Sequence, residues 1–199
     1  MLTALLQAFS APGAGFMYAI TAVLAFGLAV ALERGWWLLL RWRADAGALL
    51  RAVDAGDGAA ARSAAGAHPA AELLAAAEGQ PTAEAAWDAM GARAALVEAQ
   101  VTGRVPYLGA VGNISTMLGL LGTVYGLILA FQGLGDAGAA ERATRLSDGI
   151  ATAMATTAYG LLVGIPALAL HAAYDRRARE VLALCEAVAG ATAARLRRT

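Results

Sequence analysis

The sequence predicts an all-α membrane protein with three transmembrane helices. Three observations lead to this class: 59% of the 199 residues are hydrophobic, only 15% are charged, and three long windows hold no charged residue. Soluble domains average about 45–50% apolar and about 25% charged residues. The chain also contains 54 alanines, and because alanine has the highest helix propensity, helices are favoured over strands.

The three windows are residues 1–32, 105–135 and 149–174, and none contains Asp, Glu, Lys or Arg. Each is longer than the roughly 20 residues that a helix needs to cross a bilayer. One such window would be compatible with a buried helix of a soluble protein, but a chain of this length cannot cover all three with a soluble core. We therefore expect the first span within residues 1–34, the second at 105–132 and the third at 149–174.

The first window could also be read as a secretory signal sequence, because it is apolar and N-terminal. It lacks the basic n-region of such a signal and its apolar part is too long, so we expect a retained anchor over about residues 13–32. Aromatic and arginine side chains of the kind found at membrane interfaces come directly after it. They are Arg34, Trp36, Trp37, Arg41, Trp42 and Arg43.

The arginines predict the orientation of the chain, because cytoplasmic segments carry an excess of them near the membrane. Arg34 and Arg41 come after the first window, and Arg176 and Arg177 come after the third. Residues 1–12, before the expected first span, contain no arginine. The sequence therefore predicts an N-terminus outside and a C-terminus in the cytoplasm.

The remaining segments are assigned from this orientation. We expect residues 35–104 to form a cytoplasmic helical segment, residues 133–148 a periplasmic loop, and residues 175–199 a cytoplasmic helix that continues the third span. In the first segment, His68-Pro69 and Gly79-Gln80-Pro81 are turn signals between Ala-rich stretches. The expected helical stretches are 43–67 and 70–103.

Composition also excludes several classes of function. The net charge is zero, so the basic excess of a nucleic-acid-binding protein is missing. The single cysteine, Cys185, excludes an internal disulfide and a zinc site built from cysteines, and we expect it to be a small apolar residue of the C-terminal helix. The spans hold no Ser/His or paired-Asp arrangement for an intramembrane hydrolase. No enzyme, metal site or cofactor is predicted.

Uncharged polar residues lie at helical spacing along the second and third spans. One interpretation is that each hydroxyl bonds to the carbonyl one turn earlier and eases packing. The other is that two polar stripes face a shared, partly hydrated lumen, and the sequence leaves both interpretations open. The candidate pathway residues are Asn113, Thr116 and Thr123, in register with Leu120, and Thr152, Thr156 and Thr157.

Small residues mark the faces on which the same two spans are expected to pack. They allow membrane helices to approach closely, where van der Waals packing replaces a hydrophobic driving force. Glycines separated by four residues form a GxxxG pair in each span, and a proline in the third span predicts a kink. The candidate packing residues are Gly119, Gly122, Gly126, Gly160, Gly164 and Pro166.

The spans contain no Asp, Glu, Lys or Arg, and their only histidine, His171, lies near the end of the third. Transport of protons or sodium requires a titratable or coordinating group at depth. A transport function would therefore need a carboxylate from a partner protein. Because sodium prefers several oxygen ligands, the absence of carboxylates slightly favours protons.

The second and third spans each contain a long glycine- and threonine-rich motif. The first is Leu118-Gly-Leu-Leu-Gly-Thr-Val-Tyr-Gly126, and the second is Gly149-Ile-Ala-Thr-Ala-Met-Ala-Thr-Thr-Ala-Tyr-Gly-Leu-Leu-Val-Gly-Ile-Pro-Ala167. These two motifs resemble the MotA/TolQ/ExbB proton-channel family. Both occur in the family's order and at its separation, and the resemblance covers about residues 15–180. A three-span chain is similar to the ExbB and TolQ branch, whereas MotA proteins look like four-span chains.

The resemblance implies a multi-pass protein of the bacterial inner membrane that assembles into a homopentameric ring. Spans two and three would line a pore around the transmembrane helices of a dimeric ExbD/TolR-like partner, whose aspartate would carry the proton. A TonB- or TolA-like periplasm-spanning protein is a further implied partner, beside membrane lipids. Thr123 and Thr157 correspond to the family's pore-facing threonines.

One position departs from the family pattern. ExbB and TolQ proteins usually place a glutamate in the third span five residues before the second of these threonines, and this chain has Thr152 there. The resemblance therefore implies a path of hydroxyls and water through Thr152, Thr156 and Thr157.

The expected function is a proton-channel stator subunit that converts the proton motive force into mechanical work for outer-membrane transport or envelope maintenance. A stator of a gliding-type motility motor and a non-conducting membrane scaffold remain alternatives. The sequence does not separate the two kinds of motor, because the load is coupled through the partner.

Overall fold

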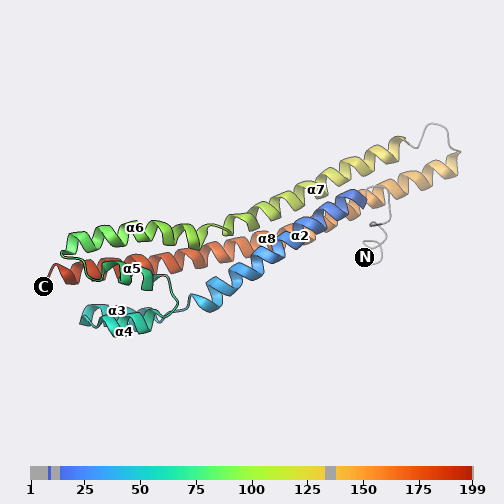
Figure 1. The fold of residues 1–199 in the computed structure, drawn as a ribbon. Coiled ribbons are helices and arrows are strands. Elements are labelled where there is room, and N and C mark those ends of the chain that lie inside the picture. Colours follow the sequence, from blue (N-terminus) through green and yellow to red (C-terminus); the bar gives the residue numbers. More distant parts are fainter. Residues whose placement is uncertain (1–8, 10–13, 133–137, 199) are drawn as a thin grey trace. The chain divides into compact units, whose positions relative to one another are not determined.

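The computed structural model describes residues 9, 14–132 and 138–198. Within these ranges the chain forms helices and no strand, which confirms the predicted all-α class there (Figure 1). The elements are α2 (Ala14–Gly35), the π-helix η1 (Trp36–Arg41), α3 (Ala46–Ala55), α4 (Gly58–Ala65), α5 (Ala70–Ala77), α6 (Ala83–Thr102), α7 (Val105–Gln132) and α8 (Ala139–Leu196).

Three helical stretches in the described part of the chain are long and apolar enough to cross a membrane, as predicted. They are Ala14–Arg41, Ala83–Gln132 and Ala140–Leu196. Helix α7 has the bounds expected for the second span. Its Pro106 lies in the first turn, where the missing N–H would have no intrahelical acceptor.

Contacts divide the chain into two compact units. The first unit contains the described residues up to Ala31 together with Tyr107–His171, and the second contains Leu32–Pro106 together with the described residues from Ala172 onward. Helices α2, α7 and α8 contribute to both units, whereas η1 and α3 to α6 belong to the second. The first unit therefore holds all the candidate pathway and packing residues, and the second holds most of the charged residues.

Helix α8 begins earlier than predicted. The predicted loop over residues 133–148 is wrong from Ala139 onward, where the helix starts, and residues 133–137 lie outside the described part. Alanines and an acidic residue in the first turn favour this start. An i,i+4 ion pair of 2.7 Å between Glu141 and Arg145 supports the next turn.

Helix α8 then continues through Pro166 to Leu196 without interruption. Proline removes one intrahelical hydrogen bond, a loss that membrane helices tolerate when neighbouring groups satisfy the freed carbonyl. The expected kink at Pro166 is therefore not a break in the helix. The C-terminal segment predicted over residues 175–199 is helical as far as Leu196.

The second unit has a helix break that the sequence analysis missed. Residues 43–67, expected to be one helical stretch, form the two helices α3 and α4. Gly56 ends α3 with a φ of +78°, a left-handed conformation that glycine adopts without strain. The Asp57 carboxylate then caps α4 by accepting a hydrogen bond of 2.9 Å from the Ala60 N–H.

Helices α5 and α6 are separated where the turn signals indicate. Helix α5 ends at Ala77, and α6 begins at Ala83. The Thr82 hydroxyl caps α6 by accepting a hydrogen bond of 3.1 Å from the Ala85 N–H. A polar cap after a proline is the sequence signal of this start.

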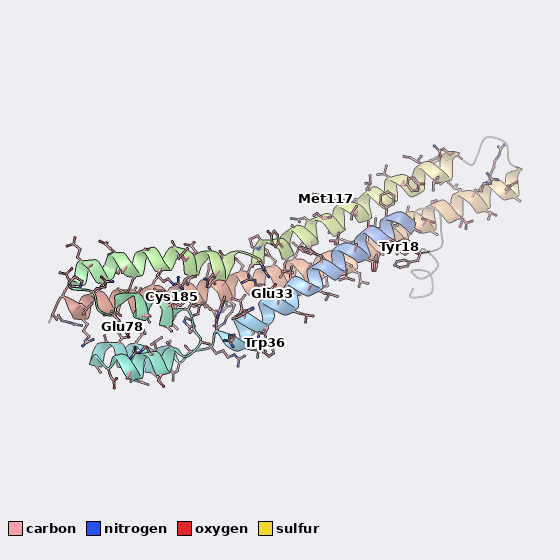
Figure 2. The ribbon with its side chains drawn as sticks, viewed as in Figure 1. Tyr18, Glu33, Trp36, Glu78, Met117 and Cys185 are labelled. Carbon is pink, nitrogen blue, oxygen red and sulfur yellow. The ribbon has the colours of Figure 1, made fainter. Side chains whose placement is uncertain are left out.

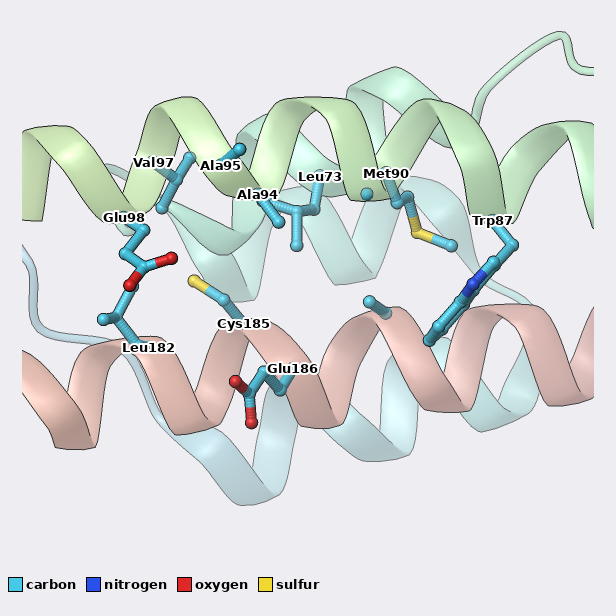
Figure 3. Close-up of a pocket in the computed structure, with 12 residues that line it drawn as sticks. Leu73, Trp87, Met90, Ala94, Ala95, Val97, Glu98, Leu182, Cys185 and Glu186 are labelled. Carbon is cyan, nitrogen blue, oxygen red and sulfur yellow. The ribbon is translucent and has the colours of Figure 1, made fainter.

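The second unit has a hydrophobic core between α5, α6 and α8. Leu73, Met90 and Val97 in this core are each 1% exposed. Cys185 is buried between α6 and α8, beside a cavity of about 460 Å³ that Trp87 also lines (Figure 3). This burial fits a thiol that serves as a small apolar residue.

His68 is buried in the same unit, with only 3% of its surface exposed. Its Nδ1 accepts a hydrogen bond of 3.1 Å from the Ala70 N–H at the start of α5, which requires a neutral ring with its proton on Nε2. Burial, and secondarily the Arg177 guanidinium, lowers the pKa of His68 from 6.5 to about 4.

We expect the second unit to lose stability as the pH falls from 6.5 to about 4. In this range the unfolded chain binds a proton on His68 that the folded chain does not, so the free energy of unfolding decreases, by roughly 3 kcal/mol at most. In a His68→Asn variant the amide oxygen can accept the same N–H, and this pH dependence should disappear. Thermal unfolding of both proteins in detergent, from about pH 8 to about pH 4, measures the difference. An equal decrease in melting temperature for both would contradict the assignment.

Candidate functional site

Helices α7 and α8 of the first unit pack backbone against backbone. An ideal Cβ placed on Gly160 would lie 2.6 Å from the Ser115 carbonyl oxygen and 2.9 Å from the Gly119 Cα. Real Cβ atoms do not approach backbone atoms so closely, so even alanine would force the two helices apart. All three residues are buried.

The structure places the other predicted packing glycines along the same contact. At Gly119 an ideal Cβ would lie 3.2 Å from the Gly160 Cα, and at the other three it would come within 2.9 Å of an atom on the opposite helix. The pairs are Gly122 with Thr156, Gly126 with Ala153, and Gly164 with Thr116 and Gly112. Pro166 differs: it is exposed and lines an apolar cavity of about 130 Å³ between α2, α7 and α8.

Two of the six candidate pathway residues lie in this helix contact. The Thr156 side chain is 1% exposed in the single chain, and its hydroxyl donates a 2.9 Å hydrogen bond to the Ala153 carbonyl. The half-buried Thr116 donates a 3.0 Å bond to the Gly112 carbonyl. Both hydroxyls bond back to their own helix, as the packing interpretation predicts.

Thr157 makes a different contact. Its hydroxyl donates a 2.9 Å hydrogen bond across the helix pair to the carbonyl of Gly119. Thr123 lies one turn further along α7, is half-buried, and donates a 2.5 Å bond to the Leu120 carbonyl. The two threonines that match the family motifs are therefore on neighbouring turns of the packed helix pair.

The last two candidates lie outside the closest contact. Thr152 on α8 is half-buried, and Asn113 on α7 is exposed. Together with Thr123 and Thr157 they form the part of the predicted polar stripes that a second protein could reach, and we refer to these four residues as the accessible polar set.

A threonine hydroxyl can serve a proton carrier in either protonation state. When it donates to a carbonyl, its lone pairs still accept a hydrogen bond from a protonated carboxyl group. When it rotates away from that carbonyl, it donates to a carboxylate. Helices α7 and α8 carry no Asp, Glu, Lys or Arg from Val105 to Gln132 or from Gly149 to Tyr174, and the one histidine of these stretches, His171, lies near the end of the second. These stretches therefore offer hydroxyls but no carboxylate.

Two polar features of the first unit, an interhelical hydrogen bond and a buried hydroxyl, were not identified from the sequence. Thr21 on α2 and Tyr159 on α8 share a 3.0 Å hydrogen bond between their hydroxyls. The Ser115 hydroxyl is fully buried and has no hydrogen-bond partner among the described residues. A tyrosine inside an apolar span was an available signal for the first, since buried Tyr hydroxyls usually find a partner.

Large apolar side chains remain exposed on the outward sides of α7 and α8 in the single chain. Met117, labelled on α7 in Figure 2, is 66% exposed. Ile165 on α8 is 63% exposed. Surfaces of this kind are covered by lipid or by other protein helices. The other exposed apolar residues of these two helices include Leu120, Leu121, Val124, Ile128, Phe131, Met154, Leu161 and Leu162.

The predicted interface residues lie in the second unit. Trp36 is exposed, Trp37 is half-buried, and the Arg41 guanidinium lies 5.2 Å from the centre of the Trp37 ring. Arg34, also predicted at the interface, is buried among other residues of the chain, with 7% of its surface exposed.

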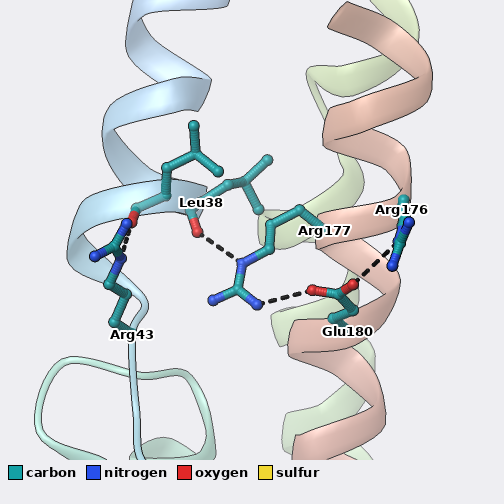
Figure 4. Close-up of polar contacts among 6 residues, drawn as sticks. Leu38, Arg43, Arg176, Arg177 and Glu180 are labelled. Atoms are coloured by element: carbon teal, nitrogen blue, oxygen red, sulfur yellow. Dashed lines mark hydrogen bonds and ion pairs between the residues drawn. The ribbon is translucent and has the colours of Figure 1, made fainter.

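The arginines after the third span are tied to local acceptors. Arg177 donates from Nε to the Leu38 carbonyl at 3.2 Å and forms a 2.9 Å ion pair with Glu180, which Arg176 also contacts at 3.2 Å (Figure 4). These contacts connect η1 with α8 inside the second unit. Across the described residues, no group of three His, Cys, Asp or Glu side chains could hold a metal ion.

Comparisons with known proteins place this geometry in context. A family model described as the MotA/TolQ/ExbB proton channel family matches residues 62–187. Biopolymer transport protein exbB1 of Vibrio cholerae is 48% identical over 62 residues, which are 31% of this chain and 27% of that protein. ExbB of Aquifex aeolicus is 35% identical over 96 residues, 48% of this chain and 64% of the relative.

The Tol-Pal system protein TolQ of Pseudomonas aeruginosa is 35% identical over 85 residues, 43% of this chain and 36% of that protein. The chain thus matches less than two thirds of the length of each of these relatives. Among solved structures, C. jejuni MotAB aligns over 96% of this chain and 74% of its own, with a TM-score of 0.46 and 19% identity.

We expect Gly160→Ala to destabilise the first unit, because the new methyl group would overlap the Ser115 carbonyl. Overpacking of this kind costs about 1–3 kcal/mol, and the melting temperature in detergent should fall. Gly190→Ala on the same helix is the matched control, since no atom lies within 4 Å of its Cβ position. That variant should be neutral or slightly stabilising through helix propensity. Equal effects of the two substitutions would show that the close contact is not needed.

Proposed function

Since this chain belongs to the MotA/TolQ/ExbB proton channel family, in its ExbB/TolQ-like branch, we propose that it is a proton-channel stator subunit of the bacterial inner membrane. With an ExbD/TolR-like partner it converts the proton motive force into mechanical work for outer-membrane transport or envelope maintenance. The observation that carries the proposal is the packed pair α7–α8, which presents threonine hydroxyls and contains no carboxylate in its spans.

The proposed assembly is a ring of identical chains, a pentamer by family resemblance. The exposed apolar sides of α7 and α8 are then covered by neighbouring copies, by partner helices and by lipid. The N-terminus lies outside, and residues 35–104 and 175–199 lie in the cytoplasm. In this arrangement α7 and α8 of every copy line the pore.

The proton site is completed by the partner. An aspartate on the partner's transmembrane helix takes up a proton on one side of the membrane and releases it on the other. Thr123 and Thr157 hydrogen-bond this carboxyl group in both protonation states, because a hydroxyl both donates and accepts. A path of hydroxyls and water continues to Thr152, while the half-buried Thr116 and the buried Thr156 hold the helix pair together.

The energies of these interactions are compatible with movement of the partner. One elementary charge that crosses the membrane releases about 2.3 kcal/mol per 100 mV of membrane potential. A hydrogen bond between a threonine and a carboxyl group in a membrane contributes about 1–2 kcal/mol. Such a bond positions the aspartate without trapping it, whereas a buried arginine in the same place would form an ion pair that is hard to break.

A non-conducting scaffold is the second candidate, and the close packing of α7 against α8 favours it, because packing alone explains why Gly119, Gly122, Gly126, Gly160 and Gly164 are glycines. Proton flux distinguishes the two candidates. We expect the chain to co-purify from its native membrane with a small one-span protein that has an aspartate in its span. Vesicles that contain this complex should conduct protons under an imposed membrane potential, as read with an enclosed pH-sensitive dye. A complex with such a partner but no flux would leave the scaffold as the function.

We expect Thr123→Ala and Thr157→Ala to leave the complex assembled and to lower proton flux in the same vesicles by about fivefold or more, the equivalent of one lost hydrogen bond. Thr157→Ser, which keeps the hydroxyl and its bond to the Gly119 carbonyl, should restore most of the flux. Thr192→Ala is the matched control, because its hydroxyl bonds to the Val188 carbonyl outside the proposed spans. Unchanged flux in both alanine variants would refute the roles of these threonines.

A further inference from the structure

The second unit contains a polar cavity of about 550 Å³ at the end of the first candidate span. Its walls come from the last turn of α2, from η1, from the turn before α5 and from the end of α6. From α2 and η1 the lining residues are Glu33, Arg34, Trp37 and Arg41. Arg34, Trp37 and Arg41 follow one another at three and four positions, so they share one helix face.

The buried side chain of Arg34 is the main feature of this cavity. The residue is 7% exposed, and its Nη1 donates a 2.8 Å hydrogen bond to the Gln100 carbonyl. Its Nε is buried and has no hydrogen-bond partner among the described residues. A buried guanidinium is costly unless its charge is offset, and Arg34 lines the cavity, so an anion held there would offset that charge.

The residues that line the cavity carry more positive than negative charge. Glu33 is paired with Arg104, and Glu72 forms a 2.5 Å ion pair with Arg93. Both carboxylates of the lining are therefore in ion pairs with other arginines, and no such ion pair includes Arg34 or Arg41 in the described part of the chain, although Glu33 still attracts the charge of Arg34. His68, which also lines the cavity, is neutral. The cavity thus has a net positive charge and suits an anion.

Two tryptophan rings indicate that the cavity lies at the level of the membrane surface. The Trp37 and Trp42 rings both line it, with their centres 5.6 Å apart. Such rings lie at the level of phospholipid head groups. Beside the cavity, the same turns of α2 and η1 expose large apolar side chains along which acyl chains can lie. These are Leu32, Trp36, Leu39 and Leu40.

We propose that this cavity binds a phosphate group through Arg34 and Arg41, and that the phosphate belongs to an anionic membrane phospholipid. A guanidinium offers paired donors to phosphate oxygens, and a phosphate in the cavity offsets the buried charge of Arg34. The site ties the end of the first span to the lipid surface. It goes beyond the proposed function, because it rests only on the second unit and needs neither the partner nor proton flux.

Native mass spectrometry of the full chain in detergent tests the site, with dioleoyl phosphatidylglycerol as the anionic probe and dioleoyl phosphatidylcholine as the zwitterionic one. We expect tighter binding of phosphatidylglycerol. Its apparent Kd should rise about fivefold in Arg41→Gln and in Arg34→Gln, as for the loss of one interfacial charge. Arg176→Gln is the matched control, an 81% exposed arginine near the membrane that does not line the cavity, and it should bind as the unmodified chain does.

The Arg41 variant keeps the test decisive if Arg34→Gln does not fold, because Arg41 is exposed and its loss leaves the Arg34–Gln100 bond in place. Equal binding of the two lipids, or equal binding by Arg41→Gln and Arg176→Gln, would overturn the proposal. Inorganic phosphate is the competitor that separates the two sources. If it displaces the lipid at a similar concentration, the phosphate site stands and the lipid is overturned as its source.

Discussion

The close approach of Gly119 and Gly160 is the contact on which the rest of the first unit depends. Between membrane helices there is no hydrophobic driving force, so association relies on steric fit and on hydrogen bonds made at short range. Because both positions lack a side chain, the Gly119 carbonyl comes within 2.9 Å of the Thr157 hydroxyl, and Thr156 can pack against Gly122. A larger residue at Gly160 would break the interhelical hydrogen bond and the burial of Thr156 together. Packing and polar chemistry are thus one feature in this helix pair.

The separation of charge from the spans is the second constraint. Many charged residues of the second unit form ion pairs outside the spans, as Arg177 does with Glu180 and Arg104 with Glu33. Away from their ends, the second and third spans carry only hydroxyls and the Asn113 amide as polar side chains, and such groups are inexpensive to bury when they bond to carbonyls. These two spans can therefore pack without burying an unpaired charge.

Composition and periodicity predicted the helical class and the bounds of α7, because long uncharged windows have few alternatives. They failed where a short local signal contradicted the composition of the longer stretch around it. Asp57 after Gly56 starts a new helix inside an alanine-rich stretch. The charges around Glu141 made the start of α8 resemble a loop. Periodicity gives each residue an angle about its own helix axis, but not the neighbour it meets. For that reason Thr156 and Thr157, adjacent in the sequence, could not be assigned in advance to packing and to the interhelical hydrogen bond.

Arg34 could not be assigned from sequence for a related reason. An arginine directly after an apolar span is read as an exposed interfacial residue, and only the fold reveals that the end of α6 covers it.

Thr152 leaves the third span without a carboxylate, and this has an energetic consequence. A carboxylate inside a span costs free energy to insert, up to about 2.5–3.5 kcal/mol at the helix centre. In a low-dielectric site its pKa also rises and couples to that of any second carboxylate nearby. With a threonine at this half-buried position, neither cost arises in the chain itself. Under the proposed mechanism, the only carboxylate in the pore is then the partner's aspartate, so its ionisation responds to hydroxyls, water and membrane potential. Proton uptake and release by this aspartate then depend on the position of the partner's helix relative to Thr123 and Thr157. This dependence is what allows proton movement to be coupled to mechanical movement.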